Sequence, residues 1–294
     1  LDSLLGRYPD PVRLDGDALL VGDRRIALSA GKETADLDWR ALGVDVVIVA
    51  TGRPTPRAEA EGHLARGATR VVLCTPLVGR ADATVVFGVN EEKLAPEHRI
   101  VSVGSVTAIC AAPVLKVLVE SFGVERVFLT TVHAYGAHLA LADVPAEDMR
   151  SGRAAAENII PQPTNADELI LELLPELAGR VSGMAINVPV ANGSVADLTC
   201  WHPRPVGVEE INAALAAACA GPLAGVIAYE REPIVSSDVL HSTSSGTFDS
   251  LSTMVVGGKV SKTLTFYDNA WGYAHRVVDL LGRLAAFGEE ETRG

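Results

Sequence analysis

Apolar residues in the first hundred positions occur in short runs separated by more polar segments. The run at residues 46–50 is apolar throughout and ends at Thr51-Gly52, a pattern typical of a buried parallel strand that leads into a turn. A segment rich in Ala and Glu follows and predicts a helix, and further strands are predicted at residues 70–74 and 84–88. Strands and helix alternating at this spacing indicate one half of a doubly wound sheet.

The N-terminal part has a different pattern, because apolar and polar residues alternate there in two short stretches. These stretches are residues 14–21 and 24–28, and Gly22-Asp23 connects them. A two-residue Gly-Asp link between alternating stretches predicts a β-hairpin.

The second part of the chain mixes helical and strand periods. Residues 169–177 and 208–220 have helical apolar spacing. Residues 184–190, 195–202 and 261–267 predict strands of a mostly antiparallel sheet. A last helix is predicted from about residue 269 to 286, and its expected core face comprises Val277, Val278, Leu280, Leu281 and Leu284.

The stretch at residues 102–113 has features of a reactive site. It combines an apolar strand, a turn of small residues and a helix start at Ser105-Val106-Thr107, where free backbone N–H groups suit an anion or a developing oxyanion. A β-branched strand later in the chain ends in His133, which can supply a proton. Such an arrangement needs a nucleophile between the two hydroxyls, and Val106 occupies that position.

Length and charge narrow the possible functions. The chain has 294 residues, 48% of them hydrophobic, which is enough for two domains with full cores. With 25 basic and 37 acidic residues its formal charge is −12, which argues against a broad surface for nucleic acid or for an anionic membrane.

Cysteine spacing and hydropathy bear on the cellular compartment. Cys74, Cys110, Cys200 and Cys219 are far apart and lie in apolar sequence, so we interpret them as buried reduced thiols, with no metal site. No apolar run approaches the roughly 20 residues of a membrane span, and no signal-peptide pattern is present. We expect a cytoplasmic protein.

A complete dinucleotide-binding site is missing from the sequence. The chain contains no G-x-G-x-x-G turn and no P-loop, although a dinucleotide fold holds the pyrophosphate on such a turn. Two interpretations compete: the sequence omits an N-terminal segment of the natural protein, or the protein lacks it. We favour the first, because the strand at 46–49 would otherwise be an apolar, unpaired edge.

Five motifs, in this order, are similar to phosphorylating glyceraldehyde-3-phosphate dehydrogenases. They are VSVGSVTAICAAP at 101–113, TTVHAY at 130–135, RAAAENIIP at 153–161, VSSD at 235–238 and YDNAWGY at 267–273. The resemblance extends from about residue 13 to about residue 281.

The resemblance implies an α/β architecture with two domains. Residues 1–104 would form a partial doubly wound, Rossmann-like NAD-binding domain that lacks its first βαβ unit and is completed by a C-terminal helix at 270–294. Residues 105–269 would form an α+β catalytic domain with a mostly antiparallel sheet.

The family's catalytic residues are only partly kept. His133 resembles the family's general acid and base, whereas the position of the catalytic cysteine is Val106, at the family's spacing from the histidine. A valine cannot form the thioester that aldehyde oxidation requires. Cys110 lies one helical turn further in, where the helix dipole has faded, so we do not expect it to substitute.

The phosphate-binding residues have also changed. By resemblance, Ser105, Thr107 and Thr164 match hydroxyls that bind phosphate. Asn187 replaces the phosphate-clamping arginine and Gly136 replaces a loop threonine, so a triose phosphate would be held poorly. Arg150 and Arg153 are candidates to compensate in part, and His138 is a weaker substrate-side candidate in the same loop.

On the cofactor side, the resemblance assigns Thr51, Gly52, Asn269 and Tyr273 to the nicotinamide end of NAD or NADP. The glutamate that usually follows the asparagine is Ala270. The implied cofactor site is therefore kept in part and is incomplete in this chain.

Three functional hypotheses remain open. The first is a glyceraldehyde-3-phosphate dehydrogenase-like protein that has lost its thiol-dependent activity and performs non-redox acid–base chemistry on a small carbonyl compound, using His133 and Ser105. The second is a pseudoenzyme that serves as a binding or scaffold subunit, assembled with an active paralogue through the family's interfaces. The third is an NAD(P)-dependent oxidoreductase of altered specificity. Separately, the resemblance implies a small-molecule substrate and a homo-oligomer, either a dimer or a tetramer.

Overall fold

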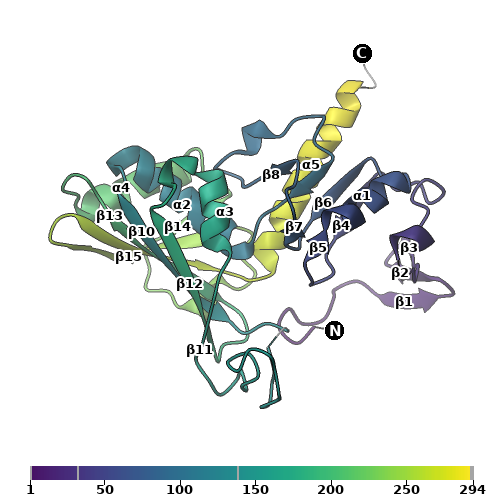
Figure 1. Ribbon diagram of the computed structural model, residues 1–294, viewed down its shortest axis with the longest axis horizontal. Helices are drawn as coiled ribbons and strands as arrows, with labels where there is room; N and C mark the ends of the chain where they lie inside the picture. The colour runs from purple at the N-terminus through teal and green to yellow at the C-terminus, as the bar shows by residue number, and fades with distance from the viewer. Residues whose placement is uncertain (1, 32, 138, 292–294) are drawn as a thin grey trace.

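A parallel sheet of four strands forms the centre of the first domain (Figure 1). The computed structural model describes all residues except 1, 32, 138 and 292–294. The strand order is β4-β6-β9-β8, and every neighbouring pair is parallel. Their bounds are β4 Val46–Val49, β6 Arg70–Leu73, β8 Ala83–Thr84 and β9 Ile100–Ser102. The carboxyl ends of all four strands therefore point to one edge of the sheet.

Strand β4 lies at the outer edge of this sheet in the described part of the chain. Val47 and Val49 are buried, whereas the side chain between them, Ile48, is 44% exposed. The β-branched run thus forms the expected strand, with one face packed against α1 (Arg57–Ala65) and β6 and the other open.

A second sheet has seven strands and forms the larger domain. Its order is β11-β12-β10-β13-β16-β15-β14, with parallel pairing only between β10 and β12 and between β14 and β15 among the described strands. The sheet is therefore mostly antiparallel, as predicted. The bounds are β10 Arg126–Ala134, β11 Ile160–Gln162, β12 Val181–Val188, β13 Ser194–Trp201, β14 Ile227–Glu230, β15 Gly246–Val256 and β16 Val260–Tyr267.

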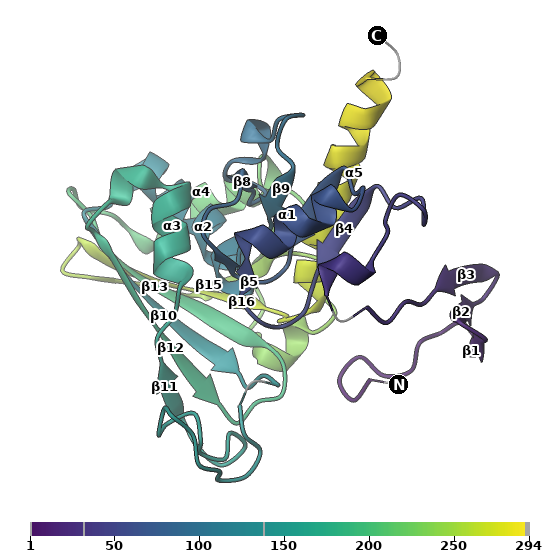
Figure 2. The same ribbon diagram turned by 45° about the vertical axis from the view of Figure 1, so that its right-hand side comes forward.

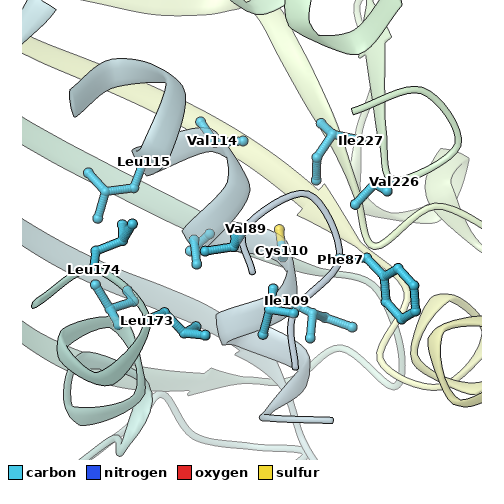
Figure 3. Packing of buried hydrophobic residues seen from close by; sticks show 14 of the residues in the cluster. Phe87, Val89, Ile109, Cys110, Val114, Leu115, Leu173, Leu174, Val226 and Ile227 are labelled. Atoms are coloured by element: carbon cyan, nitrogen blue, oxygen red, sulfur yellow. The ribbon is translucent and has the colours of Figure 1, made fainter. Parts of the chain in front are cut away.

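Three helices cover one face of the seven-stranded sheet (Figures 1 and 2). They are α2 Val106–Phe122, α3 Ala166–Leu173 and α4 Val208–Ala220. Helix α2 lies at the centre of the core and is apolar on nearly every side, as a fully enclosed helix must be. Figure 3 shows Cys110 on this helix surrounded by residues from both domains, including Phe87 and Ile227. The core is thus continuous from one domain to the other.

The C-terminal helix α5 (Trp271–Glu291) returns to the first domain, beside its parallel sheet (Figure 1). Val277, Leu280 and Leu284 are buried as predicted. Val278 is 65% exposed, so its assignment to the core face was wrong. It lies about 100° around the helix from Val277, and at that angle its side chain faces solvent.

The N-terminal strands form a small sheet that stands apart from the two larger ones (Figure 2). Its members are β1 Val12–Asp15, β2 Ala18–Val21 and β3 Arg24–Ala27. The hairpin at Gly22-Asp23 is present, but residues 14–21 are not one strand. Gly16 has φ of +60° and allows a second hairpin between β1 and β2.

Two other predictions of strands need correction. The strand predicted at 84–88 ends at Thr84, because the Asn90 side chain bonds both the N–H of Val86 and the carbonyl of Thr84 and closes a turn. Strands β14 and β15 were missed. The remaining elements are β5 Thr55–Pro56, which pairs with β7 Leu77–Val78, and the short 3-10 helices η1 Thr34–Asp36, η2 Glu91–Lys93, η3 Pro175–Leu177 and η4 Ser236–Val239.

Candidate active site

The start of helix α2 meets the carboxyl end of strand β10. In the parallel register of β10 and β12, His133 is paired with Asn187 and Thr131 with Ala185, and these side chains share the face that α2 covers. The sequence 130–133 places Thr131 two residues before His133, so strand alternation puts both on this face.

These elements enclose a pocket of about 490 Å³, which we call the inner pocket. Among the described lining side chains only His133 is ionisable; the others are polar and neutral, or apolar. The lining consists of Ser105, Val106, Thr107, Thr131, His133, Gln162, Pro163, Thr164, Asn165, Ala185 and Asn187. Five of the predicted site residues, Ser105, Thr107, His133, Thr164 and Asn187, are thus brought together.

Hydrogen bonding fixes the tautomer of His133. Its Nδ1 lies 2.5 Å from the carbonyl oxygen of Ala134 and 3.4 Å from the side-chain nitrogen of Asn269. The shorter contact determines the tautomer. A carbonyl oxygen can only accept a hydrogen bond, so Nδ1 carries the proton and donates the hydrogen bond to Ala134. In neutral His133 the lone pair is then on Nε2, which is the form of imidazole that acts as a base.

Asn269 is itself held in place by the neighbouring strand. Ser194 Oγ donates to Asn269 Oδ1 at 2.6 Å and accepts from the backbone N–H of Ala134 at 2.9 Å. The N–H of Asn269 also donates to Asn192 Oδ1 at 3.1 Å. These bonds link the end of β10 to the segment before α5 and hold the polar groups around His133.

The N-terminus of α2 supplies hydrogen-bond donors to the same pocket. Ser105 is the N-cap, with extended backbone angles, and its Oγ accepts from the N–H of Ala108 at 3.1 Å. The amides of Val106 and Thr107 in the first turn have no acceptor within the helix. Together with the helix dipole they favour negative charge at this end of the pocket.

The side chain of Val106 lies where these groups converge, and it lines both the inner pocket and the adjoining cleft. Cys110 is not among the described residues that line either the inner pocket or the outer cleft. It is fully buried, its Sγ contacts the carbonyl of Thr265 at 3.7 Å, and burial raises the pKa of its thiol. The thiol is therefore protonated and enclosed, as expected from its position one turn into the helix.

Polar contacts behind the pocket fix its other walls. Thr107 Oγ1 lies 3.0 Å from the hydroxyl of Tyr267, and burial raises the pKa of that phenol, which stays protonated. Asn187 donates to Gln162 Oε1 at 2.9 Å. Thr131 Oγ1 is buried and has no hydrogen-bond partner in the described chain. Gln162 and Thr131 were not identified from the sequence, although the alternation of β10 contained the signal for Thr131.

A larger cleft of about 550 Å³, the outer cleft, adjoins the inner pocket. It lies at the carboxyl ends of the parallel strands, where ligands bind in open α/β sheets. Cys74 directly follows β6, Thr84 ends β8 and Ser102 ends β9. The two spaces share Ser105, Val106 and Asn165. The other lining residues are Thr75, Pro76, Leu77, Gly79, Arg80, Ala81, Gly104, Glu168, Leu169, Glu172, Asn269 and Tyr273.

The turn between β9 and α2 connects the cleft to the C-terminal helix. Gly104 has φ of +78°, a conformation that favours glycine, and its carbonyl accepts from the hydroxyl of Tyr273 at 3.1 Å. Tyr273 and Asn269 thus line the cleft, as predicted for residues at a nicotinamide end.

The residues that line the outer cleft fit the nicotinamide end of a dinucleotide. Asn269, Tyr273 and Thr75 offer an amide, an aromatic ring and a hydroxyl on the cleft walls, which suits a flat, polar ring such as nicotinamide. Thr51 and Gly52 follow β4 and are exposed, and neither is among the lining residues of the cleft. The sequence has no glycine-rich turn for the pyrophosphate.

The structure does not bring the two loop arginines to the inner pocket. Arg153 Nε pairs with Asp143 Oδ1 at 3.3 Å, and both side chains are exposed. Arg150 lines a surface hollow beside Met184 that adjoins the inner pocket, with which it shares Gln162 and Pro163. Gly136 follows β10 in a turn, and His138 lies outside the described residues. Among the described residues, no arginine or lysine lines the inner pocket.

In the part of the chain that the structure describes, no cluster of three or more His, Cys, Asp or Glu side chains has the arrangement of a metal site. No helix in that part has the length and apolarity to cross a membrane.

Comparison with known proteins identifies the family. The model of the C-terminal domain of glyceraldehyde 3-phosphate dehydrogenase matches residues 105–269, and that of its NAD binding domain matches residues 1–57. The glyceraldehyde-3-phosphate dehydrogenase of Geobacillus stearothermophilus is 45% identical over 288 residues, 98% of this chain and 86% of that protein. Glyceraldehyde-3-phosphate dehydrogenase 1 of Bacillus subtilis is 43% identical over the same shares. The glyceraldehyde-3-phosphate dehydrogenase of Mycobacterium avium is 45% identical over 282 residues, which are 95% of this chain and 83% of that protein. The chain therefore belongs to the glyceraldehyde-3-phosphate dehydrogenase family.

Proposed function

We propose that this protein has lost the thiol-dependent dehydrogenase reaction and performs non-redox acid–base chemistry on a small carbonyl compound. The observation that carries the proposal is the meeting of His133 with the N-terminus of α2 around one pocket from which a thiol is absent among the described lining residues. A base and a set of oxyanion donors remain, while the covalent step has no nucleophile.

The roles follow from the geometry. Nε2 of His133 takes a proton from the carbon next to the carbonyl group and returns it to a neighbouring position. The amides of Val106 and Thr107 and the dipole of α2 stabilise the enolate oxygen that forms. Ser105 caps the helix and keeps these amides in place. The isopropyl group of Val106 provides an apolar surface against which the carbonyl compound lies.

Proton exchange tests this proposal without knowledge of the natural substrate. Hydroxyacetone is incubated with the protein in D₂O, and loss of the α-proton signal is followed by NMR. We expect exchange above the buffer rate, and we expect His133→Ala to abolish it. His275→Ala is the matched control, because this histidine contacts Trp271 on α5 and lines neither pocket. Unchanged exchange in His133→Ala, or no exchange by the unaltered protein, contradicts the proposal.

A second candidate function is a binding or scaffold subunit, and the uncovered face of the seven-stranded sheet favours it. Phe128 is paired with Thr199, Thr199 with Lys262, and Lys262 with Met254, so these residues form one row across four strands, on the face away from α2. Phe128 is 54% exposed and Met254 is 48% exposed. Exposed apolar side chains gathered on one sheet face mark a protein interface, and a second copy of this chain would cover it.

A further inference from the structure

A row of hydrogen bonds leads from the loop before β11 into the inner pocket. Asn187 Nδ2 donates to Gln162 Oε1 at 2.9 Å, and Gln162 Nε2 donates to Ser151 Oγ at 2.9 Å. The Ser151 hydroxyl donates in turn to Asp148 Oδ2. Asn187 and Gln162 line the inner pocket, whereas Ser151 and Asp148 line the adjoining hollow. These four side chains, which we call the Asp148 network, therefore link the pocket to a surface loop.

Strand pairing holds the two amides of this network side by side. Gln162 is the last residue of β11 and pairs with Ala185 of β12 in antiparallel register. Asn187 lies two residues further along β12, so it is the diagonal neighbour of Gln162 on the same face of the sheet. The Asn187 side chain is buried, with the residue only 4% exposed. Its amide therefore has little freedom beyond rotation about its own axis.

The carboxylate of Asp148 determines which atom each amide presents. Hydrogen bonds from the Ser151 hydroxyl and from the N–H of Arg150 lower the pKa of Asp148, so it is ionised and can only accept. Ser151 must therefore donate to Asp148, and it accepts from Gln162 Nε2. Gln162 then turns Oε1 to Asn187, which must donate its Nδ2. The remaining atom of that amide, Asn187 Oδ1, is an acceptor.

Two polar groups beside His133 are left without a partner. In the described chain no hydrogen bond engages Asn187 Oδ1 or Thr131 Oγ1. Thr131 lines the pocket, is 1% exposed, and has the alanines Ala185 and Ala196 as its neighbours on β12 and β13. Asn187 pairs with His133 in register, and Thr131 lies two residues before His133 on the same face. Enclosed polar groups of this kind normally pair with a ligand or with water.

We propose that Asn187 Oδ1, oriented by the Asp148 network, accepts a hydrogen bond from a substrate hydroxyl, so that the pocket prefers hydroxylated carbonyl compounds to plain ketones. This inference rests on the proposed function, because it names the substrate class of the same site. Thr131 offers a second polar contact to such a compound. Ser151 and Asp148 act as positioning residues, since they orient the Asn187 amide from outside the pocket. A hydrogen bond between neutral groups changes an affinity by about threefold to tenfold.

Three small ketones test the inference by binding. Hydroxyacetone, methoxyacetone and 2-butanone share a methyl ketone skeleton and carry a hydroxyl, a methoxy and a methyl group at the same position. Only the hydroxyl can donate a hydrogen bond. Ligand-observed NMR titration gives the three dissociation constants without turnover. We expect hydroxyacetone to bind at least threefold more tightly than 2-butanone, and methoxyacetone to bind no more tightly than 2-butanone.

Variants outside the pocket assign the preference to the network. Ser151→Ala removes the link between Asp148 and Gln162, so the ratio of hydroxyacetone to 2-butanone affinity should fall at least twofold. Ser151→Thr keeps a hydroxyl and should restore the ratio. Ser182→Ala is the matched control, because this serine of β12 is exposed and lines neither space. Asn187→Leu removes the acceptor itself and should abolish the preference, and circular dichroism of each variant checks its folding.

Several results would overturn the inference. The first is 2-butanone or methoxyacetone binding to the unaltered protein as tightly as hydroxyacetone, and the second is no measurable binding of any of the three. An equal ratio in Ser151→Ala and the unaltered protein also contradicts it. Binding and proton exchange are measured separately, so the two proposals can fail independently. A protein without exchange can still prefer the hydroxylated ketone, and one that exchanges protons can bind all three ketones alike.

Discussion

The hydroxyls of Thr107 and Tyr267 lie 3.0 Å apart, so the last strand of the seven-stranded sheet holds the first turn of α2 in place. The ring of Tyr267 also meets the ring of His133 edge-on, with centroids 6.2 Å apart. One buried side chain therefore contacts both the candidate base and the helix that supplies the oxyanion donors.

Tyr267→Phe should weaken the fold and the site together. It removes one buried hydrogen bond and leaves the Thr107 hydroxyl without this partner, at a cost of about 1 to 2 kcal/mol in the free energy of unfolding. Urea denaturation measures that loss. The rate of α-proton exchange should fall while the ring contact with His133 is kept. An unchanged unfolding free energy would show that Thr107 finds another partner.

Val106→Cys should create a rapidly reactive thiol in the site. The introduced side chain lies in the first turn of α2 and faces both spaces, where the helix dipole lowers the pKa of a thiol. Cys110 is fully buried and its pKa is raised, so it should resist labelling. Iodoacetamide labelling of the native protein followed by peptide mass spectrometry compares the two positions. Labelling of Cys110 at a similar rate would contradict the geometry of α2 described above.

The sequence predicted those features that depend on local periodicity. The run at 46–49 and the helix at 208–220 have clear periods, and the structure has β4 and α4 at these positions. Strand β15 was missed because its Ser, Thr and Asp residues hide the alternation, and the pairing of β15 with β16 shifts register between Asp249 and Met254. Its existence depends on the strands beside it.

Where motif and strand alternation agreed, as at His133 and Ser105, the structure brings the candidate residues to one pocket. The positions of Arg150 and Arg153 depend on a long loop, whose path is set by contacts distant in sequence. In the structure Arg153 pairs with Asp143 and Arg150 lines a hollow beside the inner pocket. Glu168 and Glu172 could be placed on one helix face but not against the cleft. That placement depends on how α3 packs on the sheet.

Stability should fall as the pH drops below about 6.5, the ordinary pKa of histidine, partly because of His202. Burial lowers the pKa of this side chain, which is bonded to the carbonyl of Gly123 and to Ser261, both at 2.7 Å. The neutral form is therefore favoured when folded, and unfolding takes up a proton below the unfolded pKa. The stability contributed by neutral His202 is present above pH 6.5 and is lost as the pH falls toward the folded pKa, by at most about 1.4 kcal/mol per pH unit.

His202→Gln isolates this contribution. The variant is less stable at every pH, but its unfolding free energy should depend less on pH between about 5 and 7 than that of the unaltered protein. Urea denaturation at a series of pH values measures the slope. His63 has a pKa that burial also lowers, so some slope should remain in the variant. If the unfolding free energies of both proteins had the same dependence on pH, His202 would take up its proton in the folded state as readily as in the unfolded state, which would contradict the prediction.

Phe128→Glu should separate subunits if a second copy covers the uncovered sheet face. Phe128 and Met254 lie in the same row across the strands, and a carboxylate buried there without a partner would be strongly unfavourable. Sedimentation over a range of concentrations should show an oligomer for the unaltered protein and a monomer for the variant. Leu42→Glu is the matched control, since this side chain is 52% exposed but lies far from that row, in the segment before β4. A monomeric unaltered protein, or dissociation by both variants, would remove the sheet face as the site of self-association and with it the main support for the scaffold function.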